Sequence, residues 1–282
     1  MSTTGPDRMD VDAIGNPTLE ELAALGRDLG FQPVRNEAPE ALSPAQIARY
    51  NDLGFLMPFA GLDAGEITDL REFFAGVLDA ALARGDSSYS INTAHLRFGA
   101  IYDLMRHPAI LAPVRDLLGP DVVAWGAHFF CKLPHDGRRV PWHQDCAYWP
   151  LTPTRTVTVW LAIDDADAAN ANMRFIPRSH RHGLVDYAVS DSERDVLKLA
   201  VGDAERFGDV PVDAALAAGQ FSIHSDLLLH GSEANESDRR RCGLTMRYAA
   251  AEVRAHCGWH RKGVVVSGAD ASGHWLNAPR PA

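Results

Sequence analysis

Cysteine is scarce in this sequence, with four residues among 282. These four residues form no Cys-x-x-Cys pair and no spacing typical of a zinc ribbon. So few cysteines in so long a chain argue against a disulfide-stapled scaffold and favour a reducing compartment. We therefore expect a cytoplasmic protein stabilised by an ordinary hydrophobic core, which a 46% content of hydrophobic residues can supply.

Long apolar runs and an excess of basic charge are also lacking. No apolar run approaches the ~20 residues that a membrane-spanning helix needs, and Met1 to Asn16 has no basic segment followed by an apolar one. With 27 Lys and Arg against 37 Asp and Glu, the net charge is −10, whereas a nucleic-acid surface needs cations in excess. We therefore predict no membrane or nucleic-acid partner and expect a small-molecule substrate, while the composition leaves the oligomeric state open.

Internal repeats and low-complexity tracts are absent from the sequence as well. Residues 1–16 are rich in small and polar types, and we expect them to be disordered. The remaining length fits a single domain over 17–282. Within it we expect a helical part at about 17–120, a barrel at about 121–250 and a C-terminal tail at 251–282.

Helix signals dominate the first part of this domain. Ser43-Pro44 is typical of an N-cap followed by proline at the first helical position, and Gly54 is expected to end that helix. Asp63 and Glu66 form a capping-box pair ahead of apolar residues at helical spacing. A further helix is predicted over about 108–120, between a proline and a Gly-Pro pair.

Strand signals follow residue 120. Short runs rich in β-branched and aromatic residues, bounded by Gly, Pro, Asp and Asn, lie at 122–133, 156–163, 173–176, 220–223 and 242–248. An insert of mixed charge, roughly 183–207, could be loop or helix on this evidence. Helices followed by many short strands predict an α+β, mainly β chain, with an antiparallel sandwich or barrel and the N-terminal helices packed on one sheet.

Two His-x-Asp motifs occur in the strand-rich part, His143-Gln144-Asp145 and His224-Ser225-Asp226. Residues two apart at a strand end point the same way, so such a pair can hold one metal ion. A third ligand from a distant strand would complete the two-His-one-carboxylate set of non-haem Fe(II) oxygenases, which leaves metal positions open. One motif alone carries little information, because chance supplies about one in a chain with this composition.

The first motif has the better downstream partner. His230 lies far enough along the chain to come from another strand, and Arg241 follows eleven residues after it. The other downstream histidines have no arginine at this offset, and His230 is too close to His224 to lie on a separate strand. We therefore predict His143, Asp145 and His230 as metal ligands, and the second motif as residues beside the site that are structural or orient a ligand.

Further motifs surround these residues in a fixed order: Trp142-His143-Gln144-Asp145 with Tyr148, Pro150 and Pro153, then His230-Gly231-Ser232, Asn235 and Arg241. In this order they resemble the phytanoyl-CoA dioxygenase family of Fe(II)- and 2-oxoglutarate-dependent oxygenases, from about Ala45 to Tyr248. The resemblance implies a double-stranded β-helix, which is a jelly-roll or cupin-like barrel. It also implies a hydroxylase of unactivated C–H bonds that uses Fe(II), 2-oxoglutarate and O2 and releases succinate and CO2.

The resemblance implies the same three catalytic iron ligands, and it implies contacts to the co-substrate. Arg241 should hold the far carboxylate of 2-oxoglutarate in a bidentate geometry that a guanidinium suits. Ser232, Trp160 and His128 match further co-substrate contacts, the alternatives being a turn serine, a core tryptophan and a hydrogen-bonded core histidine. Arg240 is the alternative to its neighbour, because strand alternation does not allow both arginines to face inward.

The sequence departs from the family pattern at two places. It has Asn170-Ala171-Asn172 where the family often has glycine, and Pro177-Arg178-Ser179-His180 where the family has Pro-Gly-Ser-His. Both lie on the loop after the Trp160 strand, and we expect them to bear on the substrate and not on iron. Halogenating relatives replace the metal carboxylate with a small residue, so the presence of Asp145 predicts hydroxylation.

The residues expected to face the substrate mix polar and aromatic types: Asn92, His95, Tyr148, Trp149, Arg178 and His180. This mixture favours a small polar or zwitterionic molecule, such as an aminophosphonate or a betaine-like amine, over an acyl-CoA or a hydrophobic natural product. The segment Gly273-His274-Trp275 is a candidate for folding back over the barrel mouth. Two alternatives remain open, a cupin-type metalloenzyme that needs no 2-oxoglutarate and a non-catalytic binding barrel.

Overall fold

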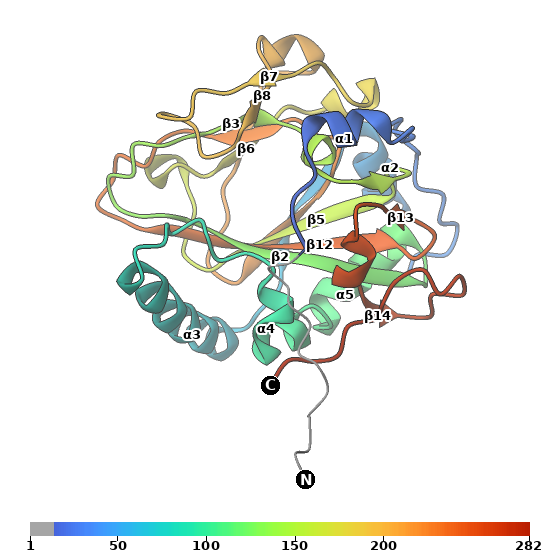
Figure 1. Ribbon diagram of the computed structural model, residues 1–282, viewed down its shortest axis with the longest axis horizontal. Coiled ribbons are helices and arrows are strands. Elements are labelled where there is room, and N and C mark those ends of the chain that lie inside the picture. Colours follow the sequence, from blue (N-terminus) through green and yellow to red (C-terminus); the bar gives the residue numbers. More distant parts are fainter. Residues whose placement is uncertain (1–13) are drawn as a thin grey trace.

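The computed structural model describes residues 14–282 (Figure 1). Of the N-terminal segment that we expect to be disordered, residues 1–13 lie outside this described part. Ile14 is buried, and the backbone carbonyl of Gly15 accepts a hydrogen bond of 3.1 Å from the indole of Trp259. Among the described residues, no helix is both long enough and apolar enough to cross a membrane.

Helices make up most of the chain before residue 120. The α-helices are α1 (Leu19–Ala24), α2 (Pro44–Leu53), α3 (Ala64–Ala83), α4 (Gly99–Leu104) and α5 (Pro108–Leu118). The predicted capping box at Asp63 is present before α3, and the predicted N-cap Ser43 is present before α2, where it forms a capping box with Gln46 as well. Gly54 ends α2 in the left-handed conformation, with φ of 87°. Local capping signals therefore located these helix ends correctly.

Two antiparallel sheets form the barrel. The large sheet has the order β1 (Phe55–Ala60), β10 (Gln220–Ser225), β5 (Thr156–Ala162), β12 (Arg241–Ala250), β2 (Val122–Lys132) and β14 (Val264–Ser267). The small sheet has the order β3 (Val140–His143), β11 (His230–Ser232), β6 (Met173–Phe175) and β9 (Val212–Ala214). Residues of both sheets line one cavity, so the sheets face each other across it. This arrangement confirms the expected mainly β jelly roll, and β14 extends the large sheet into the expected C-terminal tail.

Short elements connect these strands. They include the paired strands β4 (Leu151–Thr152) with β13 (Arg254–Ala255) and β7 (Ala188–Val189) with β8 (Leu199–Ala200). The 3-10 turns are η1 (Ala94–Leu96), η2 (Asp145–Tyr148), η3 (Ala168–Asn170), η4 (Ser179–His182), η5 (Ala204–Phe207) and η6 (Trp259–Lys262). The insert at 183–207 therefore contains β7, β8 and η5, and no α-helix.

Alternation along the strands separates the core from the cavity. On β2, Phe129 faces outward and stacks on Phe74 of α3 with ring centroids 4.7 Å apart, while Phe130 lines the cavity between the sheets. Helices α3, α4 and α5 lie along the outer face of the large sheet (Figure 1). On β12, Leu244 and Met246 belong to the core, whereas Thr245 lines the cavity. A period of two residues thus presents one face of each strand to the helices and the other to the cavity.

Candidate active site

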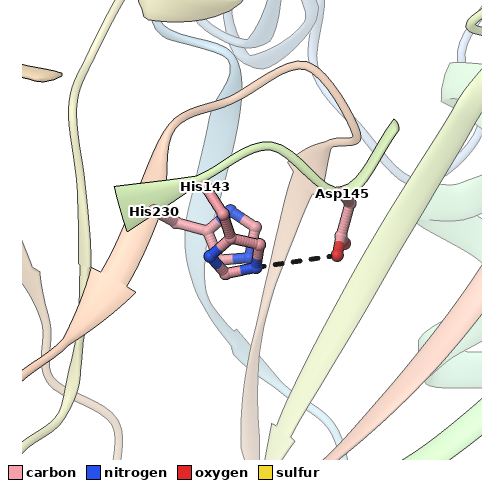
Figure 2. A group of neighbouring side chains, drawn as sticks. All are labelled: His143, Asp145 and His230. Atoms are coloured by element: carbon pink, nitrogen blue, oxygen red, sulfur yellow. Dashed lines mark ion pairs between the residues drawn. The ribbon is translucent and has the colours of Figure 1, made fainter. Parts of the chain in front are cut away.

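The three predicted metal ligands lie close together in the lining of the cavity between the two sheets. His143 ends β3, Asp145 begins η2, and His230 begins β11, where it pairs with His143 across the small sheet. All three residues are buried, and their ligand atoms lie within 4.8 Å of one another. Figure 2 shows the two imidazole rings close together, with the carboxylate facing them.

Hydrogen bonds fix the orientation of both imidazoles. Nδ1 of His143 donates to the Pro141 carbonyl at 2.9 Å, and Nδ1 of His230 donates to the Leu228 carbonyl at 2.9 Å. Because each Nδ1 carries the proton, each Nε2 has a lone pair available for a metal ion. Burial, and then the neighbouring His230, lowers the pKa of His143 to about 3, which keeps this ring neutral. The donor set is two imidazoles and one carboxylate, and it fits Fe(II).

The carboxylate of Asp145 is held in a defined orientation. Thr158 of β5 donates its hydroxyl to Oδ2 at 2.8 Å, while Oδ1 lies 3.9 Å from Nε2 of His143. Burial opposes ionisation of this carboxyl, but the positive charge of Arg247 and the nearby histidines outweigh it and lower its pKa to about 2. Asp145 is therefore ionised at neutral pH, with one oxygen left for a metal ion.

The second His-x-Asp motif lies beside the ligands. His224 on β10 is buried, and its Nε2 is 3.9 Å from Oδ2 of Asp145. Its ring centroid is 4.7 Å from that of His230, and neither of its ring nitrogens has a hydrogen-bond partner among the described residues. Asp226 is buried nearby, and its backbone carbonyl accepts a hydrogen bond from the Cys146 amide. The motif thus lies beside the site as we expected, but the expectation that His230 is too close to His224 to lie on a separate strand was wrong, because His224 is on β10 and His230 on β11 of the other sheet.

Arg241 lies in the lining of the cavity next to the metal ligands. We call this cavity the inner cavity. Besides the three ligands, the lining of this cavity includes Phe130, Trp160, Ser232, Arg241 and Thr245. The Nε of Arg241 donates to the Ala171 carbonyl at 3.0 Å, and its Nη2 donates to Oγ of Ser232 at 3.0 Å. These two bonds orient a buried guanidinium while leaving its other N–H groups unused. Arg240 points the other way and pairs with Asp164, so the strand register places Arg241 inward.

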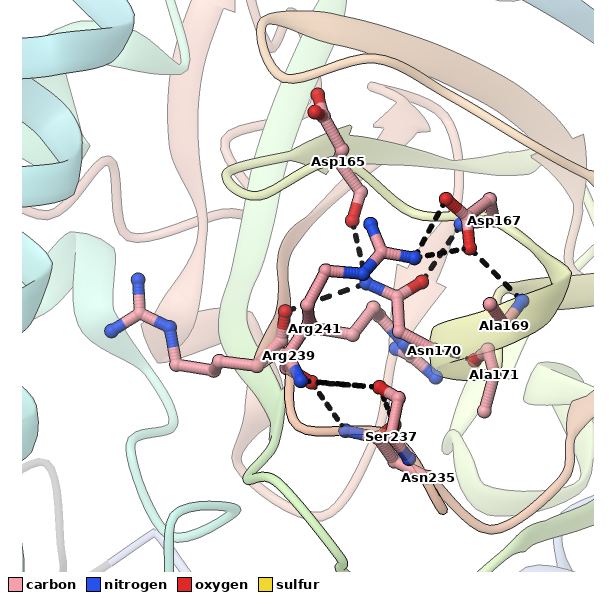
Figure 3. A network of polar contacts seen from close by, with 10 residues as sticks. Asp165, Asp167, Ala169, Asn170, Ala171, Asn235, Ser237, Arg239 and Arg241 are labelled. Atoms are coloured by element: carbon pink, nitrogen blue, oxygen red, sulfur yellow. Dashed lines mark hydrogen bonds and ion pairs between the residues drawn. The ribbon is translucent and has the colours of Figure 1, made fainter.

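The loop that departs from the family pattern is tied to Arg241. Ala171 has φ of 62°, a left-handed conformation that favours glycine, and its carbonyl accepts the bond from Arg241. Figure 3 shows further bonds around this loop: Arg239, two residues before β12, pairs with Asp167, and Asn170 donates to the Asp165 carbonyl at 2.8 Å. The loop orients the arginine of the inner cavity, and its expected influence on the substrate stays a prediction.

The other predicted co-substrate residues are divided between two places. Ser232 and Trp160 line the inner cavity, and the guanidinium carbon of Arg241 lies 5.6 Å from the Trp160 ring centroid. Gly243 makes room for this ring, because a Cβ at Gly243 would lie 2.1 Å from it. His128 lines the neighbouring cavity instead, and its Nε2 is 2.6 Å from the Tyr89 carbonyl.

A larger outer cavity of about 1020 Å³ meets the inner one at the metal ligands. Both cavities are lined by His143, Asp145, Phe130 and Arg247, so a molecule in the outer cavity can reach the ligands. The walls of the outer cavity include residues of η2, of the insert at 183–207 and of the N-terminal segment 14–19. The hydroxyl of Tyr148 joins two of these walls, since it accepts from the Leu199 amide at 3.0 Å.

Three of the six predicted substrate residues line the outer cavity: Asn92, Tyr148 and Trp149. The structure places the other three elsewhere. Arg178 pairs with Asp52 and Asp209, because its left-handed backbone (φ of 69°) turns it toward α2. His180 lies edge-on to Phe31 with ring centroids 4.3 Å apart.

His95 is buried behind the outer cavity wall, where its Nε2 is 3.0 Å from the Lys262 carbonyl. The C-terminal segment is also away from both cavities. Nε2 of His274 accepts from the Ala255 amide at 2.9 Å, and the Trp275 ring packs against Gly263. The structure thus brings neither His95 nor this segment to the metal ligands.

Several residues of the outer cavity escaped the sequence analysis: Trp125, Arg247, Trp259 and Lys262. Arg247 had a usable signal. It lies six residues after Arg241 on the same strand, and a period of two places both on the inward face. The tryptophans and Lys262 come from separate elements, and no local pattern links them.

Comparison with known proteins agrees with this geometry. The family model described as phytanoyl-CoA dioxygenase (PhyH) matches residues 50–243. The chain is 29% identical over 166 residues to the probable alpha-ketoglutarate-dependent hypophosphite dioxygenase of Stutzerimonas stutzeri, which covers 58% of this chain and 57% of that protein. It is 26% identical over 224 residues to the L-proline trans-4-hydroxylase of Streptomyces griseoviridis, with coverage of 71% and 84%.

A solved structure is similar over most of the chain. The non-heme monooxygenase ThoJ in its apo form superposes with a TM-score of 0.70 at 29% identity, covering 83% of this chain and 87% of that chain. The chain spans about half the length of the first curated relatives it matches, between 44% and 57%. The family match covers well over half of the chain and includes all three candidate ligands and Arg241. The chain therefore belongs to the phytanoyl-CoA dioxygenase (PhyH) family.

Proposed function

We propose that this protein is an Fe(II)- and 2-oxoglutarate-dependent oxygenase that hydroxylates an unactivated C–H bond of a small molecule. The observation that carries the proposal is the buried set of His143, Asp145 and His230 beside a cavity that ends at Arg241. Both imidazoles have Nδ1 engaged and Nε2 directed to the common centre. A purely structural cluster of polar residues would not need this matched orientation.

The metal ligands and the co-substrate residues of the inner cavity have proposed roles. Nε2 of His143, Nε2 of His230 and Oδ1 of Asp145 would hold the metal ion. Bound Fe(II), with 2-oxoglutarate and O2 as co-substrates, supplies an oxidant able to cleave an unactivated C–H bond, with succinate and CO2 as products. Arg241, supported by Ser232, would bind the far carboxylate of 2-oxoglutarate in a buried setting where charge-assisted hydrogen bonds are strong.

The remaining walls orient the co-substrate and exclude water. Trp160 closes one side of the inner cavity, and Thr158 keeps Asp145 directed at the metal position. The presence of a carboxylate at Asp145 supports hydroxylation over halogenation, because halogenating relatives lack it. A polar, enclosed site of this kind limits the access of water to a reactive centre.

The substrate that we propose is small and polar. The relatives named above act, by their names, on hypophosphite and on L-proline, which are both small and polar. An aminophosphonate or a betaine-like amine fits this size class, and the alternative is an acyl-CoA or a hydrophobic natural product. A cupin-type metalloenzyme or a binding barrel is less well supported, because neither needs Arg241 in the inner cavity.

A screen for substrate-stimulated succinate formation tests this function. The enzyme would be supplied with Fe(II), ascorbate, 2-oxoglutarate and a panel of small polar compounds, with the Asp145→Ala protein as the matched control. We expect succinate formation that requires Fe(II) and 2-oxoglutarate, rises with at least one compound and is lost in the variant. Equal succinate formation by the variant would remove Asp145 from the metal site, and stimulation by acyl thioesters alone would overturn the substrate class.

A further inference from the structure

Arg247 is a cation of the outer cavity whose charge acts on the candidate metal ligand Asp145. It lies on β12 opposite Gly126 of β2, whose missing side chain leaves room for it. Its guanidinium carbon lies 5.2 Å from the Trp149 ring centroid and 5.9 Å from that of Trp125. Among residues 14–282 its buried Nε has no hydrogen-bond acceptor. A buried guanidinium with unused donors is costly unless a ligand supplies acceptors.

Lys262 is a second cation in the same cavity. It lies at the end of η6, and its ammonium is 3.5 Å from the centroid of the Trp259 ring. The residue is 8% exposed, and burial, followed by the positive charge of Arg247, lowers the pKa of its ammonium. Since like charges repel, placing both beside one cavity is unfavourable until an anion lies between them.

Trp125 adds a third donor to this wall. Its indole N–H is buried and has no acceptor among the described residues, and the residue itself is 3% exposed. Its ring contacts those of Trp149 and Trp259, with centroids 4.5 Å and 5.6 Å away. Buried indole N–H groups usually find a partner, so an unpaired one on a cavity wall indicates an acceptor on the ligand.

The carboxylates on the same cavity do not balance these cations. Asp195 is bound by Arg139 at 2.6 Å, and Asp145 is directed to the metal position. The chain as a whole carries a net charge of −10, so a cavity with two uncompensated cations runs against the overall charge. Cavities lined by one sign of charge favour ligands of the opposite sign.

We propose that Arg247, Lys262 and Trp125 bind the anionic group of the substrate, a carboxylate or a phosphonate. This inference rests on the proposed oxygenase function and names the substrate class of the same site. The oxygens of the anion accept from the guanidinium, the ammonium and the indole N–H. Because Arg247 lines both cavities, an anion held there keeps the adjacent carbon atoms next to the metal ligands.

The proposed anion site favours an aminophosphonate over a betaine-like amine, the two small substrate classes that the sequence suggested. Arg247 and Lys262 themselves lie over the tryptophan rings, so these faces are occupied by the protein's own cations. A quaternary ammonium therefore has no free aromatic cage on this wall, and a phosphonate or carboxylate group has its donors ready. An aminophosphonate would bind through its phosphonate oxygens.

Binding of charged and neutral probes tests the proposal without turnover. Anaerobic calorimetry on the Fe(II)- and 2-oxoglutarate-loaded protein would compare 3-phenylpropionate with 3-phenylpropionamide, and 2-aminoethylphosphonate with choline. We expect at least one of the two anions to bind and to bind at least about tenfold more tightly than its partner. Arg247→Gln and Lys262→Met should each weaken that anion by about tenfold or more, and Trp125→Phe should weaken it less.

Two controls complete the experiment. Arg84→Gln removes one exposed positive charge far from the cavity and should leave anion binding unchanged. Fe(II) and 2-oxoglutarate binding, measured on Lys262→Met and Trp125→Phe, should match the wild type, and circular dichroism would verify the fold of all three variants. The anion site is refuted if neither acid binds, if the amide or choline binds as tightly, or if the variants bind anions like the wild type. If the wild type failed to bind Fe(II) or 2-oxoglutarate, the result would instead refute the oxygenase function.

Discussion

Replacement of Arg241 by alanine should strongly weaken 2-oxoglutarate binding. A guanidinium has five N–H donors, and two of them are used by the Ala171 carbonyl and the Ser232 hydroxyl. The remaining three are available to the far carboxylate of the co-substrate in a buried setting. Truncating one partner of such a charge pair costs about 2–5 kcal/mol. This corresponds to a rise in Kd of roughly 30-fold to 5000-fold.

The matched control for this variant is Arg240→Ala. Arg240 is the neighbouring residue, but its guanidinium bonds Asp164 at 2.8 and 2.9 Å on the other face of β12. Anaerobic calorimetry of 2-oxoglutarate with the Fe(II)-loaded proteins would measure both variants, with circular dichroism to verify the fold. We expect Arg240→Ala to stay close to the wild type. A larger loss for Arg240→Ala than for Arg241→Ala would refute both the strand register and the assignment of the co-substrate pocket.

Four further perturbations probe the site. Asp145→Ala should lose Fe(II)-dependent turnover and keep its circular dichroism spectrum, and retained turnover would contradict its role as a ligand. Thr158→Val removes the 2.8 Å hydrogen bond to the Asp145 carboxylate and should lower metal affinity about 10-fold to 100-fold in a chelator competition. Unchanged affinity would show that this bond is dispensable. Gly243→Ala would place a Cβ 2.1 Å from the Trp160 ring and should weaken 2-oxoglutarate binding in calorimetry, and a wild-type Kd would mean that the ring moves without consequence. Burial, and then the nearby guanidinium of Arg247, lowers the pKa of Lys262 to about 8. Because the ammonium is charged below that pH, anion affinity should be constant below about pH 8 and fall above it. A decline that persists in Lys262→Met would exclude this lysine as its cause.

Local signals in the sequence were sufficient for much of the fold. Capping signals located the starts of α2 and α3, and runs of β-branched residues located the long strands β2, β5 and β12. The short strands β3 and β11 were missed, because segments of three or four residues acquire their strand geometry from pairing with each other. The same pairing brings His143 and His230 together, and only the motif order had indicated it.

Side-chain direction was harder to predict than position along the chain. Arg178 was expected at the substrate because it follows the Trp160 strand, but its partner Asp52 lies on α2, and no local pattern indicates that contact. Arg247 was overlooked although alternation from Arg241 places it inward, because the family pattern drew attention to the co-substrate arginine alone. Polar residues that act through tertiary contacts therefore need the fold before they can be assigned.

Metal binding by the purified chain tests the central claim most directly. Fe(II) would be titrated anaerobically into the wild type and into His230→Ala, followed by 2-oxoglutarate. The geometry predicts one tightly bound Fe(II) per chain in the wild type, 2-oxoglutarate binding that depends on that metal, and loss of both in the variant. Equal Fe(II) binding by His230→Ala, or tight 2-oxoglutarate binding that needs no metal, would contradict a metal centre formed by His143, Asp145 and His230.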